Sequence, residues 1–138
     1  MKTLHSSFRV LHLDRSLDFY AKVGFGEIGR VSPGDGSILV MLNLPDDGEV
    51  VTLELVYDPK LDSIEVGTGF SHIVVQVNDL DAILVELREK GVTFDEPQRP
   101  AGHNGPKTCF ICDPDGYRIE LVQWPPGHTD GITRADFR

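Results

Sequence analysis

Two histidine–glutamate pairs recur at matching positions in the two halves of this chain. His5 and His72 lie 67 residues apart, and Glu54 and Glu120 lie 66 residues apart. Two imidazoles and two carboxylates suit a divalent first-row transition metal that keeps coordination positions open for a substrate. The spacing therefore predicts a metal site to which each half of the chain contributes one His and one Glu.

The sequence around these residues repeats as well. The segment from His5 to Gly24 aligns without a gap on the segment from His72 to Gly91. A single mid-strand Glu, or a single His, more often has no catalytic function. The metal-site hypothesis therefore depends on the joint spacing of His and Glu in both halves. The aligned pairs in the repeated segment include Val10 and Val77, Leu13 and Leu80, Asp14 and Asp81, Leu17 and Leu84, and Gly24 and Gly91.

The elements that must position these residues follow the same order in both halves. In the first half we expect a strand at 3–10, a helix at 14–23 with Asp14 as N-cap and Gly24 at its end, and strands at 27–31, 37–43 and 50–57. In the second half we expect a strand at 69–77, a helix at 80–90, and strands near 92–94, 108–112 and 117–121.

This order is βαβββ, twice, and it predicts an α+β fold with a mostly antiparallel sheet that curves around a cleft. The first module is expected at residues 1–57, a linker at 58–68 and the second module at 69–124. The tail at 125–138 has no periodicity, so we expect it to be extended or loosely packed, and its role is open.

Alternation along the strands indicates where the carboxylates point. Leu53 and Leu55 share one face of their strand, which leaves Glu54 on the other face. Ile119 and Leu121 likewise share a face opposite Glu120. Each Glu is therefore predicted to lie mid-strand and to point away from the core.

Composition excludes several classes of function. The 138 residues include 13 basic and 22 acidic ones, for a net charge of −9, which argues against binding to nucleic acid or to an anionic membrane. No apolar run is long enough to span a bilayer, and the N-terminus is too short and polar for a secretory signal, so we expect a cytoplasmic protein.

Cys109 and Cys112 read C-x-x-C within a strand-like run, where residues three apart point to opposite faces. Two reduced thiols are thus expected, not a redox pair.

Five segments of the chain resemble one known family. They are LHSSFRV, DRSLDFY, TLELVYD, GTGFSHI and DPDGYRIELVQ; they lie between Leu4 and Gln123, and the resemblance covers about residues 1–123. They resemble glyoxalase I (lactoylglutathione lyase), a family of the vicinal oxygen chelate superfamily. The resemblance implies tandem βαβββ modules that form a cup, a homodimer with sites shared between subunits, and His5, Glu54, His72 and Glu120 as metal ligands. The short, bacterial type of chain implies nickel or cobalt, with zinc as a further possibility.

The resemblance also implies a reaction. The hemithioacetal of methylglyoxal and a small thiol, glutathione or an analogue, would be isomerised to the S-lactoyl thioester through a cis-enediolate. Glu120 would be the main base, with Glu54 as its partner. Arg9, Asp58 and Lys107 would contact the thiol moiety. Asp58 stands where the family usually has Asn, and the tail lies outside the family pattern, so the thiol and the carbonyl compound stay open.

Two alternatives compete with this interpretation. Another metal-dependent enzyme of the superfamily, an epimerase or an extradiol dioxygenase, would use a related ligand set. The epimerases tend to have Gln where Glu54 stands, and the dioxygenases are usually longer. A metal-free module that binds small molecules or drugs would lack the ligands and line its groove with aromatic residues. Aromatic residues make up 8% of this chain, and metal content after purification distinguishes the two classes.

Overall fold

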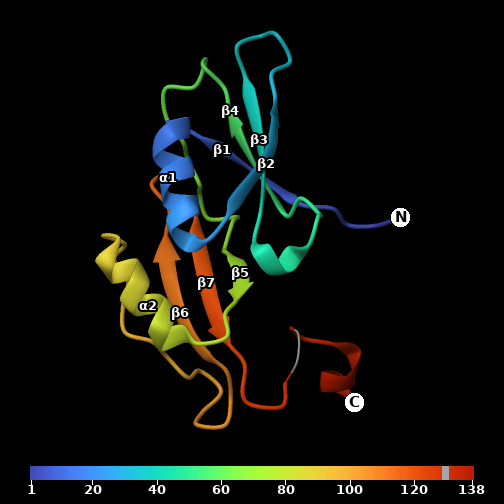
Figure 1. The fold of residues 1–138 in the computed structure, drawn as a ribbon, viewed down its shortest axis with the longest axis vertical. Helices are drawn as coiled ribbons and strands as arrows, with labels where there is room; N and C mark the ends of the chain where they lie inside the picture. Colours follow the sequence, from blue (N-terminus) through green and yellow to red (C-terminus); the bar gives the residue numbers. More distant parts are fainter. Residues whose placement is uncertain (129–130) are drawn as a thin grey trace. The chain divides into compact units, whose positions relative to one another are not determined.

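Residues 1–128 and 131–138 are described by the computed structural model, in which the chain divides into two compact units (Figure 1). Unit 1 comprises Met1–Gly67 and the short turn Asp113–Gly116, and unit 2 comprises Thr68–Cys112 and Tyr117–Arg138. The division between the halves falls at residue 67, inside the segment expected to be a linker. None of the helices in the described residues is both long and apolar enough to cross a bilayer.

Unit 1 is built on a four-stranded mixed sheet. Its order is β1-β4-β3-β2, with β1 parallel to β4 and the other neighbours antiparallel. Phe8, Val40 and Leu55 lie side by side on its buried face. The elements are β1 (Ser6–Val10), α1 (Leu13–Val23), β2 (Gly26–Val31), β3 (Ile38–Asn43), the short 3-10 helix η1 (Pro45–Asp47) and β4 (Leu53–Tyr57).

Helix α1 begins one residue earlier than the sequence indicated. His12 occupies the N-cap position and its carbonyl accepts the first helical hydrogen bond, from Ser16. The prediction of Asp14 as N-cap is therefore wrong: Asp14 lies in the first turn, where a carboxylate still interacts favourably with the helix dipole. The predicted end is confirmed, because Gly24 adopts the left-handed conformation with φ 118° and its N–H bonds to Tyr20 and Ala21.

Unit 2 is built on a three-stranded sheet of order β5-β7-β6, covered on one face by a helix. Figure 1 shows α2 lying beside β6 and β7, on which it packs Leu80, Leu84 and Leu87. Asp79 caps this helix, as its side chain accepts a hydrogen bond from the backbone N–H of Ala82. The elements are β5 (Ile73–Gln76), α2 (Leu80–Glu89), β6 (Lys107–Cys112), β7 (Arg118–Gln123) and the 3-10 helix η2 (Arg134–Phe137).

The second half departs from the expected βαβββ order. The strand predicted at 92–94 does not form, so unit 2 has the order βαββ. Val92 instead buries its side chain and donates its N–H to the carbonyl of Leu87, which ties it to the end of α2. In the described residues, the edge of β6 that faces away from β7 pairs through the isolated bridge between Gln98 and Thr108. In the tail, residues 134–137 form η2 and Gly131 N–H donates to the Gln76 side chain, while residues 132–138 are exposed, as expected of a loosely packed segment; residues 129–130 lie outside the described residues.

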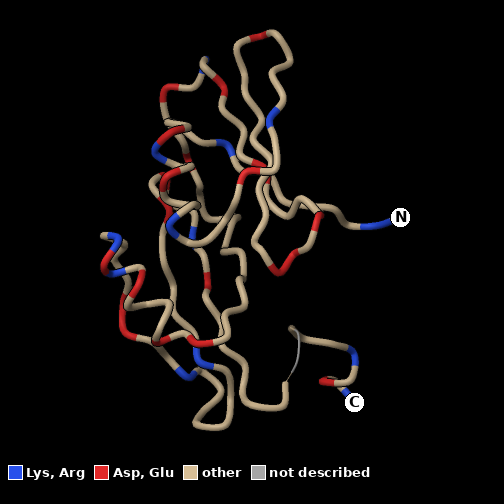
Figure 2. Tube along the Cα trace, in the orientation of Figure 1, with Lys and Arg blue, Asp and Glu red and all other residues tan. Residues whose placement is uncertain are grey.

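The predicted α+β class is confirmed. Three of the five strand pairings are antiparallel and two are parallel, so both sheets are mixed. Basic residues are dispersed among acidic ones along the trace (Figure 2), a distribution unlike the concentrated basic patch that nucleic acids require.

The two cysteines have different surroundings. Neither is in a disulfide; Cys109 is buried and Cys112 is exposed. Burial, followed by the negative charges of Asp95 and Glu96, raises the pKa of the Cys109 thiol. Its Sγ also donates to the Asp95 carbonyl at 3.3 Å. A buried thiol with a raised pKa forms little thiolate, the reactive species.

We therefore expect a thiol reagent at mildly alkaline pH to label Cys112 of the folded protein and to leave Cys109 unlabelled. Mass spectrometry of the peptides at increasing times measures both rates. After denaturation the two sites should react alike, and Cys112→Ser should remove the fast phase. Equal labelling rates in the folded protein would contradict the assigned burial.

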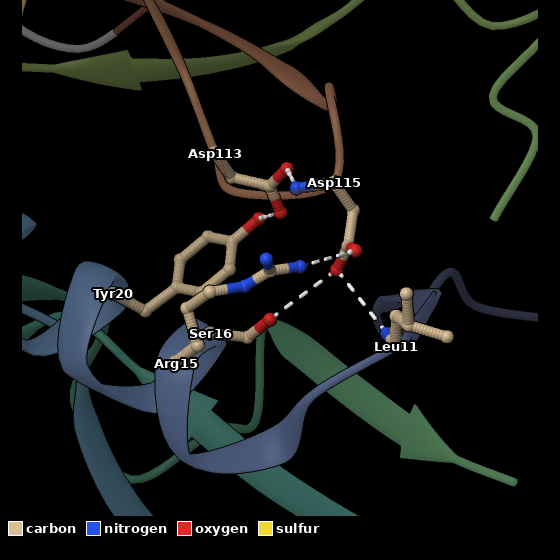
Figure 3. Close-up of polar contacts among 6 residues, drawn as sticks. All are labelled: Leu11, Arg15, Ser16, Tyr20, Asp113 and Asp115. Atoms are coloured by element: carbon tan, nitrogen blue, oxygen red, sulfur yellow. Dashed lines mark hydrogen bonds and ion pairs between the residues drawn. The ribbon is translucent and has the colours of Figure 1, made fainter. Parts of the chain in front are cut away.

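The turn Asp113–Gly116 is held on α1 by two buried carboxylates (Figure 3). The Asp113 side chain accepts from the Tyr20 hydroxyl at 2.8 Å and from the Asp115 N–H at 2.9 Å. The Asp115 carboxylate is 2% exposed and ion-pairs with Arg15 at 3.2 Å. It also accepts from the Ser16 hydroxyl at 3.3 Å and from the Leu11 N–H at 3.4 Å.

Replacing Asp115 with Ala should therefore destabilise the fold by about 2–4 kcal/mol, because it leaves the buried Ser16 hydroxyl and the Leu11 N–H without this acceptor and breaks the ion pair with Arg15. Asp115→Asn, which keeps an acceptor oxygen, should lose less stability than the Ala variant. Denaturant unfolding followed by circular dichroism measures the change, with the exposed Asp62→Ala as control. Equal stability of the Ala variant and the wild type would show that the cluster contributes nothing net.

Candidate metal centre

The first His–Glu pair is formed in unit 1, on the face of the sheet opposite its core. His5 directly precedes β1, and Glu54 lies in the parallel neighbour β4, opposite Ser7. The His5 Nε2 lies 2.8 Å from the Glu54 Oε2. Their side chains are 25% and 12% exposed, so the pair is partly shielded but open to solvent.

The second pair repeats this construction in unit 2. His72 directly precedes β5, and Glu120 lies in the parallel neighbour β7, opposite Val74. The His72 Nε2 lies 2.9 Å from the Glu120 Oε2. In both sheets the Glu faces the residue two positions after the His, so one register rule builds both pairs.

A contribution to the stability of the fold is a weak explanation for the presence of two such His–Glu pairs. A partly exposed ion pair contributes about 0–1 kcal/mol. No other group in the described part of the chain bonds either carboxylate, so each Glu keeps an oxygen available. Two adjacent ligand atoms, each roughly 2.1 Å from one metal ion at a right angle, lie about 3 Å apart. The observed separations of 2.8 and 2.9 Å therefore fit a pair of ligands to one ion.

His72 also has a partner that would orient it as a ligand. The Ser71 Oγ lies 2.7 Å from the Nδ1 of His72, on the other side of the ring from Glu120. When Nε2 is the ligand, Nδ1 carries the hydrogen and donates it to this hydroxyl, which fixes the tautomer. Within the described residues, neither unit gathers three or more His, Cys, Asp or Glu side chains in a metal-binding arrangement. The four-ligand set therefore stays a prediction.

A family model described as the Glyoxalase/Bleomycin resistance protein/Dioxygenase superfamily matches residues 2–121. The chain belongs to this superfamily. Among its members, the probable lactoylglutathione lyase of Synechocystis sp. is 32% identical over 125 residues, which cover 89% of this chain and 95% of that protein. The lactoylglutathione lyase of Haemophilus influenzae is 33% identical over 89% of this chain and 93% of that protein.

Solved structures of superfamily members agree with this assignment. The trypanothione-dependent glyoxalase I of Leishmania major superimposes with a TM-score of 0.72 at 32% identity, over 89% of this chain and 86% of that one. Glyoxalase I of Zea mays gives 0.78 at 28% identity, over 88% of this chain but 44% of the maize chain, so this chain spans less than half of it. The resemblance to glyoxalase I that the motifs indicated is confirmed.

The three residues expected to contact substrate lie in different surroundings. Arg9 is exposed on β1 and, by alternation, shares the side of that strand with His5. The Asp58 carboxylate, just after β4, accepts from the Lys60 N–H at 2.9 Å and so shapes a turn. Lys107 opens β6 and ion-pairs with Asp81 of α2. Its strand position places Lys107 on the helix-covered face, away from Glu120, which argues against contact with a substrate at that carboxylate.

Sequence reasoning missed two neighbours of the second pair. Phe110 of β6 lies directly opposite Glu120, and its ring centroid is 5.2 Å from that of His72, edge to face. The Arg118 guanidinium carbon stands 4.1 Å from the Phe110 ring centroid. By strand alternation Arg118 lies on the same side of β7 as Glu120, but the residue that Phe110 faces depends on strand register, which the sequence did not specify.

Proposed function

We propose that this protein is a metal-dependent glyoxalase I: it isomerises the hemithioacetal of methylglyoxal and a small thiol to the S-lactoyl thioester. The observation that carries the proposal is the His–Glu pair built twice by the same strand register. The lactoylglutathione lyases that align over most of the chain support it.

In this proposal His5, Glu54, His72 and Glu120 hold one divalent ion, nickel or cobalt in preference to zinc. A bound ion would supply positive charge against the negative charge that develops on the substrate oxygens. The residues do the proton work. The Glu120 carboxylate takes the proton from the carbon next to the carbonyl and returns it to the neighbouring carbon, which completes an isomerisation without net loss of atoms. Glu54, the equivalent carboxylate of unit 1, is the second candidate base.

We further propose a cytoplasmic homodimer in which each site draws ligands from both subunits. Each unit offers two ligands, and a site of this chemistry needs more than two. The absence of a disulfide at Cys109 and Cys112 is compatible with a reducing compartment. Arg9 and Asp58 are the proposed contacts to the thiol.

An isomerase assay on metal-depleted protein tests the proposal. Ni, Co, Zn and Mn are added back singly, with hemithioacetals of glutathione and of mycothiol as substrates, and thioester formation is followed by absorbance. We expect no turnover without metal and recovery with Ni or Co. Absence of turnover with every metal and both thiols, in protein shown to bind metal, would reject the proposal.

A further inference from the structure

We propose that Arg118 is a specificity-determining residue that binds a carboxylate of the substrate's thiol moiety. This inference rests on the proposed function, since it concerns which chemical group the thiol substrate must contain. Arg118 lies in β7 on the same face as Glu120, two residues before it. It is exposed, and nothing in its position contributes to the core of the sheet.

The guanidinium is held in place yet left with unused hydrogen-bond donors. Its stacking on Phe110 at 4.1 Å restricts the side chain, because a planar cation over an aromatic face is attracted to the ring. The guanidinium has five N–H donors, and contact with an aromatic ring leaves some of them for an acceptor. Among the described residues, no carboxylate lies within ion-pairing distance of Arg118, although the chain is rich in acidic residues.

Position along the strand decides which part of a substrate Arg118 can reach. The Cα atoms of residues two apart on a strand lie roughly 7 Å apart, so the backbone of Arg118 is displaced along β7 from Glu120, beside which the substrate would react. A group several bonds from the reacting carbon is needed, and in a hemithioacetal that group belongs to the thiol. Phe110, which lies opposite Glu120 on β6 and contacts the Arg118 guanidinium, offers apolar surface for the intervening carbon chain. A carboxylate matches the guanidinium fork in charge and geometry.

Ligand binding tests this inference separately from turnover. The probes are S-methylglutathione, which carries two carboxylates, and its dimethyl ester, titrated calorimetrically into protein with and without added nickel. For Arg118→Gln we expect about ten-fold or greater weakening of the acid and little change for the ester. Arg118→Lys should recover part of the affinity, because it restores charge without the fork. Added salt should weaken binding of the acid to the wild type more than to Arg118→Gln.

Arg88→Gln is the matched control. Arg88 also stacks on a ring, that of Phe94 at 5.0 Å, but it lies on α2 and not on the face that carries Glu120. It should bind both probes as the wild type does. In kinetics, Arg118→Gln should raise KM for the glutathione hemithioacetal and leave kcat close to wild type.

Equal affinity of wild type and Arg118→Gln for the acid would overturn the inference. An equal loss for acid and ester would do the same, because it would indicate an apolar or structural role. Absence of binding of the acid to wild-type protein would also overturn it. Turnover failure with normal Arg118-dependent binding would instead reject the proposed function and leave the carboxylate subsite standing.

Discussion

Replacing Glu120 with Gln is expected to leave most of the metal bound and to lower turnover by at least about 100-fold. The amide oxygen can still act as a ligand, but an amide does not accept a proton at neutral pH. Gln has the same size and shape as Glu, so the variant keeps the local geometry beside the His72 Nε2, which lies 2.9 Å from the carboxylate. The loss should therefore appear in kcat and not in the fold.

The measurement pairs metal content, by atomic emission, with kcat at saturating substrate and metal. Glu54→Gln is the matched control, because Glu54 occupies the equivalent place in the other sheet, 2.8 Å from His5. We expect a smaller loss of turnover for that variant. Unchanged turnover of Glu120→Gln with the metal bound, beside a large loss for Glu54→Gln, would assign the base to Glu54 instead.

Local patterns predicted much of the fold because they report short-range physics. The glycine at the end of α1 and the leucine spacing of α2 depend on residues within a few positions, and both predictions were confirmed. The strand at 92–94 depended on finding a partner strand, which no local pattern specifies. In the structure the backbone of Val92 bonds to α2, so the apolar residues there pack without joining a sheet.

In the candidate site, too, local patterns predicted some positions and not the long-range contacts. Alternation was enough to place Glu54 and Glu120 on the face away from the core, because their strands were identified correctly. Lys107 was expected before its strand, in a loop from which it could reach a substrate. It is instead the first residue of β6, and strand alternation then directs it toward Asp81 on α2. The ion pair with Asp81 depends on how α2 packs on the sheet, which local alternation does not specify, and contact of Lys107 with the thiol stays a prediction.

Mixing two inactive variants, His5→Ala and His72→Ala, is expected to restore activity if sites are shared between subunits. In the proposed dimer, the His5–Glu54 pair of one subunit shares an ion with the His72–Glu120 pair of the other. A mixed dimer then has one site that lacks both histidines and one that lacks neither. After full exchange about half of the dimers are mixed, so up to about a quarter of wild-type activity should return.

The alternative is that both pairs of one chain bind the same ion. Every subunit in the mixture then carries one defective site, and no activity returns however completely the subunits exchange. Native mass spectrometry of differently tagged variants measures the exchange, and the isomerase assay measures the recovery on the same sample. An equal mixture of His5→Ala with the exposed-site variant His103→Ala controls for effects of exchange itself and should retain about half of the activity in either model, because half of the sites keep His5. Demonstrated exchange without recovery would refute the shared site and would assign all four ligands to one chain.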